Sequence, residues 1–264
     1  MYNYSHYSGT GNSFLIFDRY NCDTPLLPPK MITNICENHF VDGLIYLEKS
    51  VIADYKMRIF NKDGSEAEMC GNGIRCLMDF IQKNISQNSQ CSIESNYTIH
   101  NLRIENDFVC ASMGKPSLIQ LNQQLKIDNI FFCYHYLDTG VPHIVLFVDE
   151  IDKAPIDTLG PLLRYHKHFA PRGTNVNFVS ISNEKVFIRT YERGVEGETL
   201  ACGTGATAAA YVIMQIYNKS EPIEISFKSK EVLQIHQLNG VFYQSGKVKL
   251  IKTGQISLES IPIF

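Results

Sequence analysis

The sequence lacks the features that mark several large classes of protein. It has no Cys-x-x-Cys pair, so neither a thioredoxin-type redox motif nor a zinc ribbon is indicated. The net charge is −3, and Lys and Arg are scattered without a run or stripe, which argues against a nucleic-acid partner. Apolar runs such as residues 143–148 are strand-sized and too short to cross a bilayer. Because the N-terminus does not resemble a signal peptide, we expect a cytoplasmic protein.

The cysteines are eight in number and dispersed through a chain of 264 residues. Without a secretory signal, free thiols are a better interpretation than a disulfide framework, and most of them are expected to be buried as small apolar side chains. Two of the cysteines differ from the rest in the residues that follow them in the sequence. Cys70 and Cys202 each begin a Cys-Gly-x-Gly turn, one in each half of the chain.

The two halves have the same order of predicted elements. Strand-like segments dominate both, and the apolar spacing predicts helices over residues 30–38, 72–83 and 205–217. A strand, a polar loop, a Cys-Gly-x-Gly turn and a helix occur twice, with Asn61 and Arg193 at the same distance before the two cysteines. Internal duplication is the economical explanation, and it predicts two α+β lobes with a cleft between them.

A thiol at a helix N-terminus is chemically activated. The unpaired N–H groups and partial positive charge there stabilise the thiolate, and the glycines let a ligand carboxylate approach the backbone. A single copy of the motif is more simply a tight turn with an incidental buried thiol. Two copies that face each other could remove a proton from one side of a carbon and return one to the other side. That arrangement inverts a stereocentre.

Polar residues near the two turns match an amino-acid substrate. Glu192 and Arg193 carry one charge of each sign, and an Arg can grip a carboxylate with two parallel hydrogen bonds. Taken singly, this pair could be a surface ion pair, and each asparagine could be a turn former. Five neutral amides accompany the pair: Asn12, Asn61, Asn72, Asn175 and Asn177.

These residues fall in motifs that resemble those of the diaminopimelate epimerase family. The resemblance covers nearly the whole chain and is highly specific, because the motifs occur together and in order. They are Ser8–Phe14, Phe60–Ser65, Met69–Cys76, Pro142-His143, Gly173–Phe178, Glu192–Gly194 and Ala201–Ala206.

The resemblance implies an α+β fold of two pseudo-symmetric lobes. Each lobe would be a curved, mostly antiparallel sheet or barrel wrapped around a central helix, with the active site in the cleft between them. We expect residues 1–114 to form the N-terminal lobe, completed by a C-terminal strand at 252–264, and residues 115–251 to form the other. The family uses neither pyridoxal phosphate nor a metal, and its members are often dimers, so a homodimer is the expected assembly.

The resemblance also implies a role for each matching residue. Cys70 and Cys202 would be the acid/base pair that interconverts LL- and meso-diaminopimelate, a step of lysine and peptidoglycan biosynthesis. The carboxylate at the reacting carbon would be held by Gly71, Asn72, Gly203 and Thr204. The rest of the substrate would be bound by Asn12, Asn61, Asn175, Glu192 and Arg193, with His143 beside the thiols.

Three departures from the family pattern bear on specificity. Gly43 stands where the family often has Gln, Val141 stands in place of the Asn of Asn-Pro-His, and one extra residue lies between Arg193 and Thr199. The first two each remove an amide from the expected pocket wall, whereas both cysteine turns are intact. Because lost hydrogen bonds relax discrimination, an alternative is a racemase of relaxed specificity, for example for glutamate.

Other functional classes remain as alternatives. One is a fold relative that isomerises a ring compound with a carboxylate base, as phenazine-pathway proteins do, although the presence of both thiols argues against it. Another is a non-catalytic amino-acid or anion-binding module, or a thiol redox sensor. Exchange of the substrate's α-hydrogen with solvent separates an epimerase from the last two.

Overall fold

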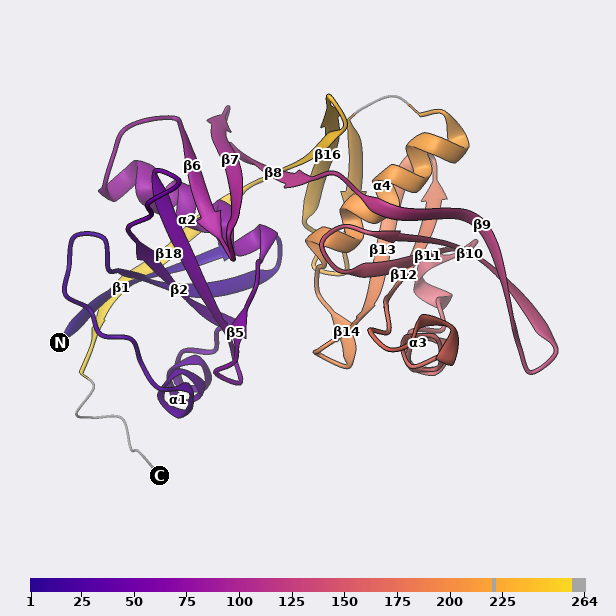
Figure 1. The fold of residues 1–264 in the computed structure, drawn as a ribbon, viewed down its shortest axis with the longest axis horizontal. Helices are drawn as coiled ribbons and strands as arrows, with labels where there is room; N and C mark the ends of the chain where they lie inside the picture. The colour runs from indigo at the N-terminus through magenta and orange to yellow at the C-terminus, as the bar shows by residue number, and fades with distance from the viewer. Residues whose placement is uncertain (220–221, 258–264) are drawn as a thin grey trace. The chain divides into compact units, whose positions relative to one another are not determined.

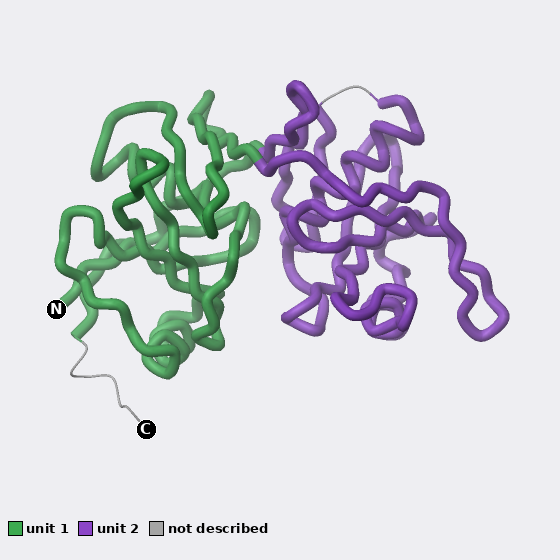
Figure 2. Tube along the Cα trace, viewed as in Figure 1, with its two compact units in different colours: residues 1–112, 245–264 green, residues 113–244 purple. Residues whose placement is uncertain are grey.

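The chain folds into two compact units. The computed structural model describes residues 1–219 and 222–257. Unit 1 comprises residues 1–112 and the C-terminal segment that starts at Ser245, and unit 2 comprises residues 113–244 (Figure 2). From the sequence we propose residues 1–114 with 252–264 as one lobe and residues 115–251 as the other. Residues 258–264 of that expected terminal strand lie outside the described residues.

The elements of unit 1 combine a sheet with two helices (Figure 1). The helices are α1 (Pro29–His39) and α2 (Gly71–Asn84). The strands are β1 (Tyr2–Gly9), β2 (Asn12–Asp18), β3 (Gly43–Glu48), β4 (Tyr55–Asn61), β5 (Glu66–Ala67), β6 (Gln90–Ser95), β7 (Thr98–Glu105), β8 (Phe108–Gly114, which runs into unit 2) and β18 (Val248–Ile256).

Unit 2 has the same kind of composition. Its helices are α3 (Ile156–Arg164) and α4 (Gly203–Tyr217), with short 3₁₀ turns at Ile151–Lys153 and Lys167–Phe169. Its strands are β9 (Ser117–Ile127), β10 (Ile130–Asp138), β11 (Pro142–Phe147), β12 (Asn175–Ser182), β13 (Lys185–Glu192), β14 (Gly197–Thr199), β15 (Ile223–Ser226), β16 (Val232–Leu238) and β17 (Val241–Gly246).

Strand pairing confirms the internal duplication. In unit 1, β2 runs parallel to β3, β3 antiparallel to β4, and β4 pairs with β5 and, in parallel, with β6. In unit 2, β11, β12, β13, β14 and β15 repeat these pairings in the same order and directions. The helix that follows a cysteine turn, α2 or α4, comes at the same place in each series.

The predicted α+β class is confirmed. In the described residues, 18 strands form a single hydrogen-bonded sheet accompanied by four α-helices, and not closed barrels. The three predicted helices correspond to α1, α2 and α4. Helix α3 was not predicted, because Gly160 and Pro161 in its middle are the residues least typical of a helix. None of the described helices is long and apolar enough to cross a membrane.

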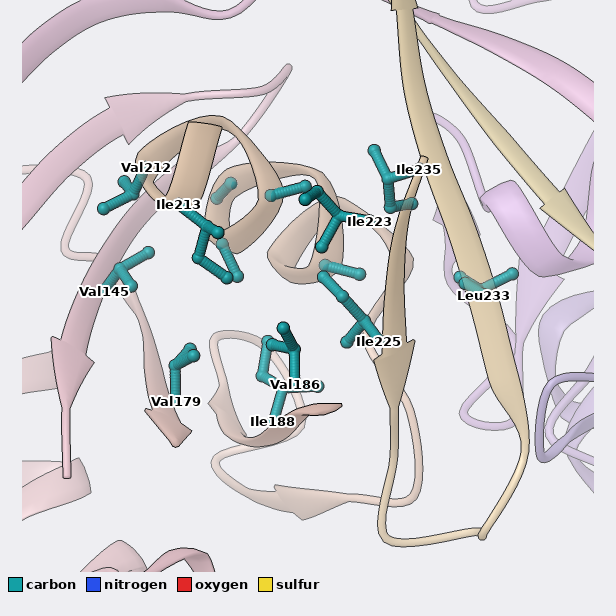
Figure 3. Close-up of a cluster of buried hydrophobic side chains, with 14 of the residues drawn as sticks. Val145, Val179, Val186, Ile188, Val212, Ile213, Ile223, Ile225, Leu233 and Ile235 are labelled. Atoms are coloured by element: carbon teal, nitrogen blue, oxygen red, sulfur yellow. The ribbon is translucent and has the colours of Figure 1, made fainter. Parts of the chain in front are cut away.

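Each cysteine-capped helix is buried in its own unit. The predicted apolar stripe of α2, which includes Ile74 and Leu77, is fully buried. The Ala-rich α4 is covered on several sides, as its nearly uniform apolar sequence predicts. Figure 3 shows Val212 and Ile213 of α4 in a cluster with side chains of β11, β12, β13, β15 and β16. This packing fixes the helix start, and therefore the cysteine before it, relative to the sheet of its unit.

Candidate active site

Cys70 is the N-cap residue of α2. Its backbone is extended, with φ −141° and ψ 115°, and its half-buried Sγ accepts a hydrogen bond of 3.4 Å from the backbone N–H of Gly73. The sulfur therefore takes the place of the oxygen that usually caps a helix. The first-turn N–H groups direct partial positive charge toward it, which favours a thiolate there.

Cys202 occupies the same position before α4. Its backbone is again extended, with φ −126° and ψ 105°, and its side chain is buried. The sulfur lies 3.5 Å from Oγ1 of Thr204, and its thiol also hydrogen-bonds to the carboxyl group of Glu192. The two predicted acid/base residues are thus equivalent by position and differ in their immediate partners.

Glu192 lies at the end of β13 with its carboxyl group turned inward. Burial raises its pKa, and the hydrogen bonds from Thr199 and Cys202 act in the opposite direction. The Thr199 hydroxyl donates to Oε2 at 2.8 Å. A carboxyl group with a raised pKa beside a thiol is suited to exchange a proton with it. The contact of Glu192 with Cys202 was not predicted from the sequence.

In unit 1, two of the predicted asparagines are joined. Nδ2 of Asn72 donates to Oδ1 of Asn12 at 2.6 Å. Arg75 and Thr10 complete the group: Nη2 of Arg75 donates to Oδ1 of Asn72 and to Oγ1 of Thr10, each at 2.7 Å. Sequence reasoning missed Arg75 and Thr10. The available signal was the spacing of Arg75, one helical turn after Asn72.

In unit 2, His143 is fully buried and held by Asn177. Nδ2 of Asn177 donates to the Ile144 carbonyl at 2.8 Å and lies 3.1 Å from Nδ1 of His143, while its Oδ1 accepts from Thr190. Because the Ile144 carbonyl can only accept, Asn177 must present N–H groups on that side, which makes His143 Nδ1 an acceptor. Its proton is therefore on Nε2, which has no hydrogen-bond partner among the described residues.

The environment of His143 keeps the ring neutral. Burial is the main cause and the charge of Arg193 adds to it, so the pKa of His143 falls from 6.5 to about 3. A neutral ring can donate its Nε2 proton in a hydrogen bond to a substrate oxygen. It does not carry a positive charge at neutral pH.

This burial predicts a pH dependence of stability. Between pH 6.5 and about 3 the folded protein binds fewer protons at His143 than the unfolded chain does. The free energy of unfolding therefore has its full value above the unfolded pKa and declines as the pH falls through this window. We expect the variant His143→Gln to lose less stability than the parent between about pH 7 and about pH 5, as measured by urea unfolding. Equal losses in the two proteins would contradict the assignment.

Both ends of the Asn175 side-chain amide form hydrogen bonds with backbone groups. Its Nδ2 donates to the Pro142 carbonyl at 2.9 Å, and its Oδ1 accepts from the N–H of Arg193 at 2.8 Å. It therefore ties the start of β11 to the turn after β13. Arg193 is half-buried and its Nη1 donates to the Arg172 carbonyl at 3.4 Å.

The strand register changes which residue of unit 2 corresponds to Asn61 of unit 1. Counting back from the cysteines matches Asn61 with Arg193. However, Glu66 and Glu198 lie at the same distance before the two cysteines, and they pair with Phe60 in β4 and Tyr191 in β13. The next residue along each of these strands is Asn61 in unit 1 and Glu192, which pairs with Gly197, in unit 2. The extra residue lies in the turn at 193–196, which is longer than its counterpart at 62–64. Asn61 is exposed, and its Nδ2 donates to Oγ of Ser65 at 3.0 Å.

Gly43 and Val141, the two other positions that depart from the family pattern, both lie at or beside the start of a strand. Gly43 pairs with Asn61, and a Cβ on Gly43 would lie 2.5 Å from the Phe60 carbonyl oxygen, so this backbone accepts no side chain there. Val141 lies just before β11, in the place that Asn12 has at the start of β2.

The backbone sites expected to bind a carboxylate lie in the first turns of the two helices. Gly71 and Asn72 begin α2, and Gly203 and Thr204 begin α4. The Gly203 carbonyl accepts from Nε2 of the buried Gln244 at 2.8 Å, another contact that the sequence did not indicate. No group of His, Cys, Asp and Glu side chains in the described residues could hold a metal ion.

Comparison with solved structures identifies the fold. A phenazine biosynthesis protein of the PhzF family from Bacillus anthracis superposes with a TM-score of 0.73 at 13% identity, covering 97% of this chain and 99% of that one. A hydroxyproline epimerase from Agrobacterium vitis superposes with a TM-score of 0.69 at 13% identity, covering 98% and 93%. At these identities the likeness concerns the fold alone.

Sequence comparison identifies the family. The family model described as diaminopimelate epimerase matches residues 4–119 and 135–251. Relatives named diaminopimelate epimerase include those of Chlamydia muridarum, 35% identical over 96% of this chain and 94% of the relative, and of a Hydrogenobaculum species, 37% identical over 96% and 98%. These matches do not favour the alternative of a racemase for another amino acid. The chain belongs to the diaminopimelate epimerase family.

Proposed function

We propose that this protein interconverts LL- and meso-2,6-diaminopimelate by proton transfer at the α-carbon. The observation that carries the proposal is the duplicated site: two thiols, each the N-cap of a buried helix, at matching positions of two repeated units in a chain of this family. Both proton transfers are assigned to the chain's own side chains. We further propose a cytoplasmic enzyme of lysine and peptidoglycan biosynthesis that acts on a small amino acid as a homodimer.

In the proposed reaction, one sulfur acts as base and the other as acid. The thiolate removes the α-proton from one face, and the electron pair of that C–H bond is left as a carbanion delocalised into the adjacent carboxylate. The other thiol delivers its proton to the opposite face, so the configuration is inverted and one thiol and one thiolate are exchanged. The reaction requires Cys70 and Cys202 to act on the same carbon.

The helix termini supply electrostatic stabilisation. We assign Gly71, Asn72, Gly203 and Thr204 to the carboxylate at the reacting carbon, because first-turn N–H groups direct partial positive charge to that carboxylate as its charge grows. The distal end of the substrate is assigned to Asn12, Asn61, Asn175 and Arg193, with His143 as a neutral donor. Asn175 would act by fixing the backbone of Arg193, given its two backbone contacts.

The sequence predicts that Glu192, beside Arg193, binds the substrate; we assign it a different role. Its carboxyl group accepts from the Cys202 thiol, so we assign it to the orientation and protonation of that thiol, and not to the distal ammonium group. A carboxyl group with a raised pKa is suited to this task.

Solvent hydrogen exchange tests the proposal. In D₂O, the protein is expected to introduce deuterium at the α-carbon of LL-diaminopimelate while meso-diaminopimelate accumulates, as followed by NMR and chiral chromatography. L-Glutamate, tested in parallel, measures the breadth of specificity, and we expect little or no D-glutamate. A binding module or redox sensor would leave the α-hydrogen in place, and that result would refute the proposed activity.

A further inference from the structure

Arg75 lies fully buried in the second turn of α2. Its Nη2 donates to Oδ1 of Asn72 and to Oγ1 of Thr10, each at 2.7 Å. A guanidinium group has donors and no acceptor. Arg75 therefore fixes which atom of the Asn72 amide faces the protein interior: the oxygen must point toward Arg75.

The orientation of the Asn72 amide also fixes the orientation of a second amide, that of Asn12. With its oxygen held by Arg75, Asn72 directs its NH₂ group to Oδ1 of Asn12 at 2.6 Å. Asn12 must then direct its own NH₂ group away from Asn72. Asn12 is half-buried at the start of β2, so its side chain is not fully enclosed by the protein. The series Arg75, Asn72 and Asn12, here called the amide relay, thus presents a hydrogen-bond donor at its end.

The relay also fastens the β1–β2 turn to α2. Thr10 in this turn has φ +50°, a left-handed conformation that is unfavourable for a β-branched residue, and its hydroxyl is held by Arg75. The neighbouring Gly9 allows close packing, since a Cβ there would lie 2.8 Å from Sγ of Cys76 and 3.3 Å from the Asn72 carbonyl oxygen. The same guanidinium therefore sets both the position and the polarity of Asn12.

We propose that Arg75 is a positioning residue that, through Asn72, makes the side-chain amide of Asn12 a hydrogen-bond donor to a carboxylate group of the substrate. The inference rests on the proposed function and adds a selectivity to it: this subsite takes a carboxylate and rejects an ammonium group. Unit 2 has Thr207, Thr204 and Val141 at the corresponding positions, so the duplicated unit does not repeat the relay.

The first test compares two substitutions of Arg75. Arg75→Met removes every donor and frees both amides to rotate, whereas the ammonium group of Arg75→Lys can still donate to both oxygens. We expect Arg75→Met to raise the KM for diaminopimelate by about ten- to a hundredfold, the range for lost hydrogen bonds to a charged group, with a much smaller change in kcat. Arg75→Lys should restore most of the KM. Equal KM values in Arg75→Met and the parent, or no difference between Met and Lys, would overturn the inference.

The second test does not touch the buried cation and so serves even if Arg75→Met fails to fold. Asn12→Asp keeps the oxygen that accepts from Asn72 and replaces the outward NH₂ by a carboxylate oxygen. The relay predicts a higher KM, because a donor to the substrate carboxylate becomes a repelling charge. If Asn12 instead accepted from an ammonium group, KM would fall, and that outcome would overturn the inference.

Asn183→Asp is the matched control, because it makes the same change of charge on the exposed turn between β12 and β13. It should leave KM unchanged. Thermal unfolding of each variant establishes that it is folded. The parent protein distinguishes this inference from the proposed function: a parent that catalyses no α-hydrogen exchange refutes the function, whereas an active parent with KM values insensitive to Arg75 and Asn12 refutes the relay alone.

Discussion

Replacing either Cys70 or Cys202 with alanine is expected to lower the rate of LL-to-meso interconversion by about 10³-fold or more. Inversion requires a base on one face of the α-carbon and an acid on the other, and a positioned acid or base is worth about 10² to 10⁴ in rate. Each substitution removes one of the two, while the backbone N–H groups that hold the carboxylate remain. Chiral chromatography of the product measures the loss.

The single variants should retain one half-reaction. The remaining thiol can still remove and return a proton on its own face. In D₂O we therefore expect each single variant to introduce deuterium, without inversion, into the one isomer whose α-hydrogen faces that thiol, and the double variant to show neither process. Cys133→Ala, which changes an exposed thiol, is the control and should retain the parent rate. A single variant that keeps more than about a tenth of the activity would contradict the two-base assignment.

Mild oxidation with hydrogen peroxide should abolish activity through a disulfide between Cys70 and Cys202. Two sulfurs that serve one carbon must come close together during the reaction. Peroxide accepts two electrons and two protons from the thiols and leaves as water while the S–S bond forms. We expect near-complete inactivation that dithiothreitol reverses, together with a cross-linked peptide that contains both residues in the mass spectrum.

Two exposed thiols provide the control for oxidation. Cys22 and Cys133 are accessible to peroxide, and a variant with serine at both positions should be inactivated in the same way as the parent. Activity that survives peroxide would count against close approach of the two sulfurs. So would a reversible loss without the cross-link between residues 70 and 202.

The elements that carry the cysteines follow from local sequence. The stripe of Ile74 and Leu77 and the Ala-rich run of α4 have helical periodicity, and the Cys-Gly-x-Gly turns mark where the helices begin. The helix α3 could not be anticipated, since its Gly160 and Pro161 oppose helix formation and tertiary packing overrides them. The strand β9 was not predicted either: it is mostly exposed, and Gln123 interrupts the alternation of its apolar residues Leu121 and Leu125.

The candidate site was predictable in its residues and less so in its connections. Motif order was enough to select the cysteines, but the match of Asn61 with Arg193 was wrong, because an extra residue in a turn shifts a count along the chain and leaves strand register unchanged. The contact of Glu192 with Cys202 and the contact of Arg75 with Thr10 join residues of different elements. No local pattern in the sequence encodes those contacts.

The most direct test of the two-thiol assignment is a crystal structure of the protein with diaminopimelate, or an isosteric analogue, bound. We expect the Sγ atoms of Cys70 and Cys202 to lie on opposite faces of one α-carbon, each within reach of its hydrogen. Both sulfurs on the same face, or one of them remote from the ligand, would contradict the proposed reaction.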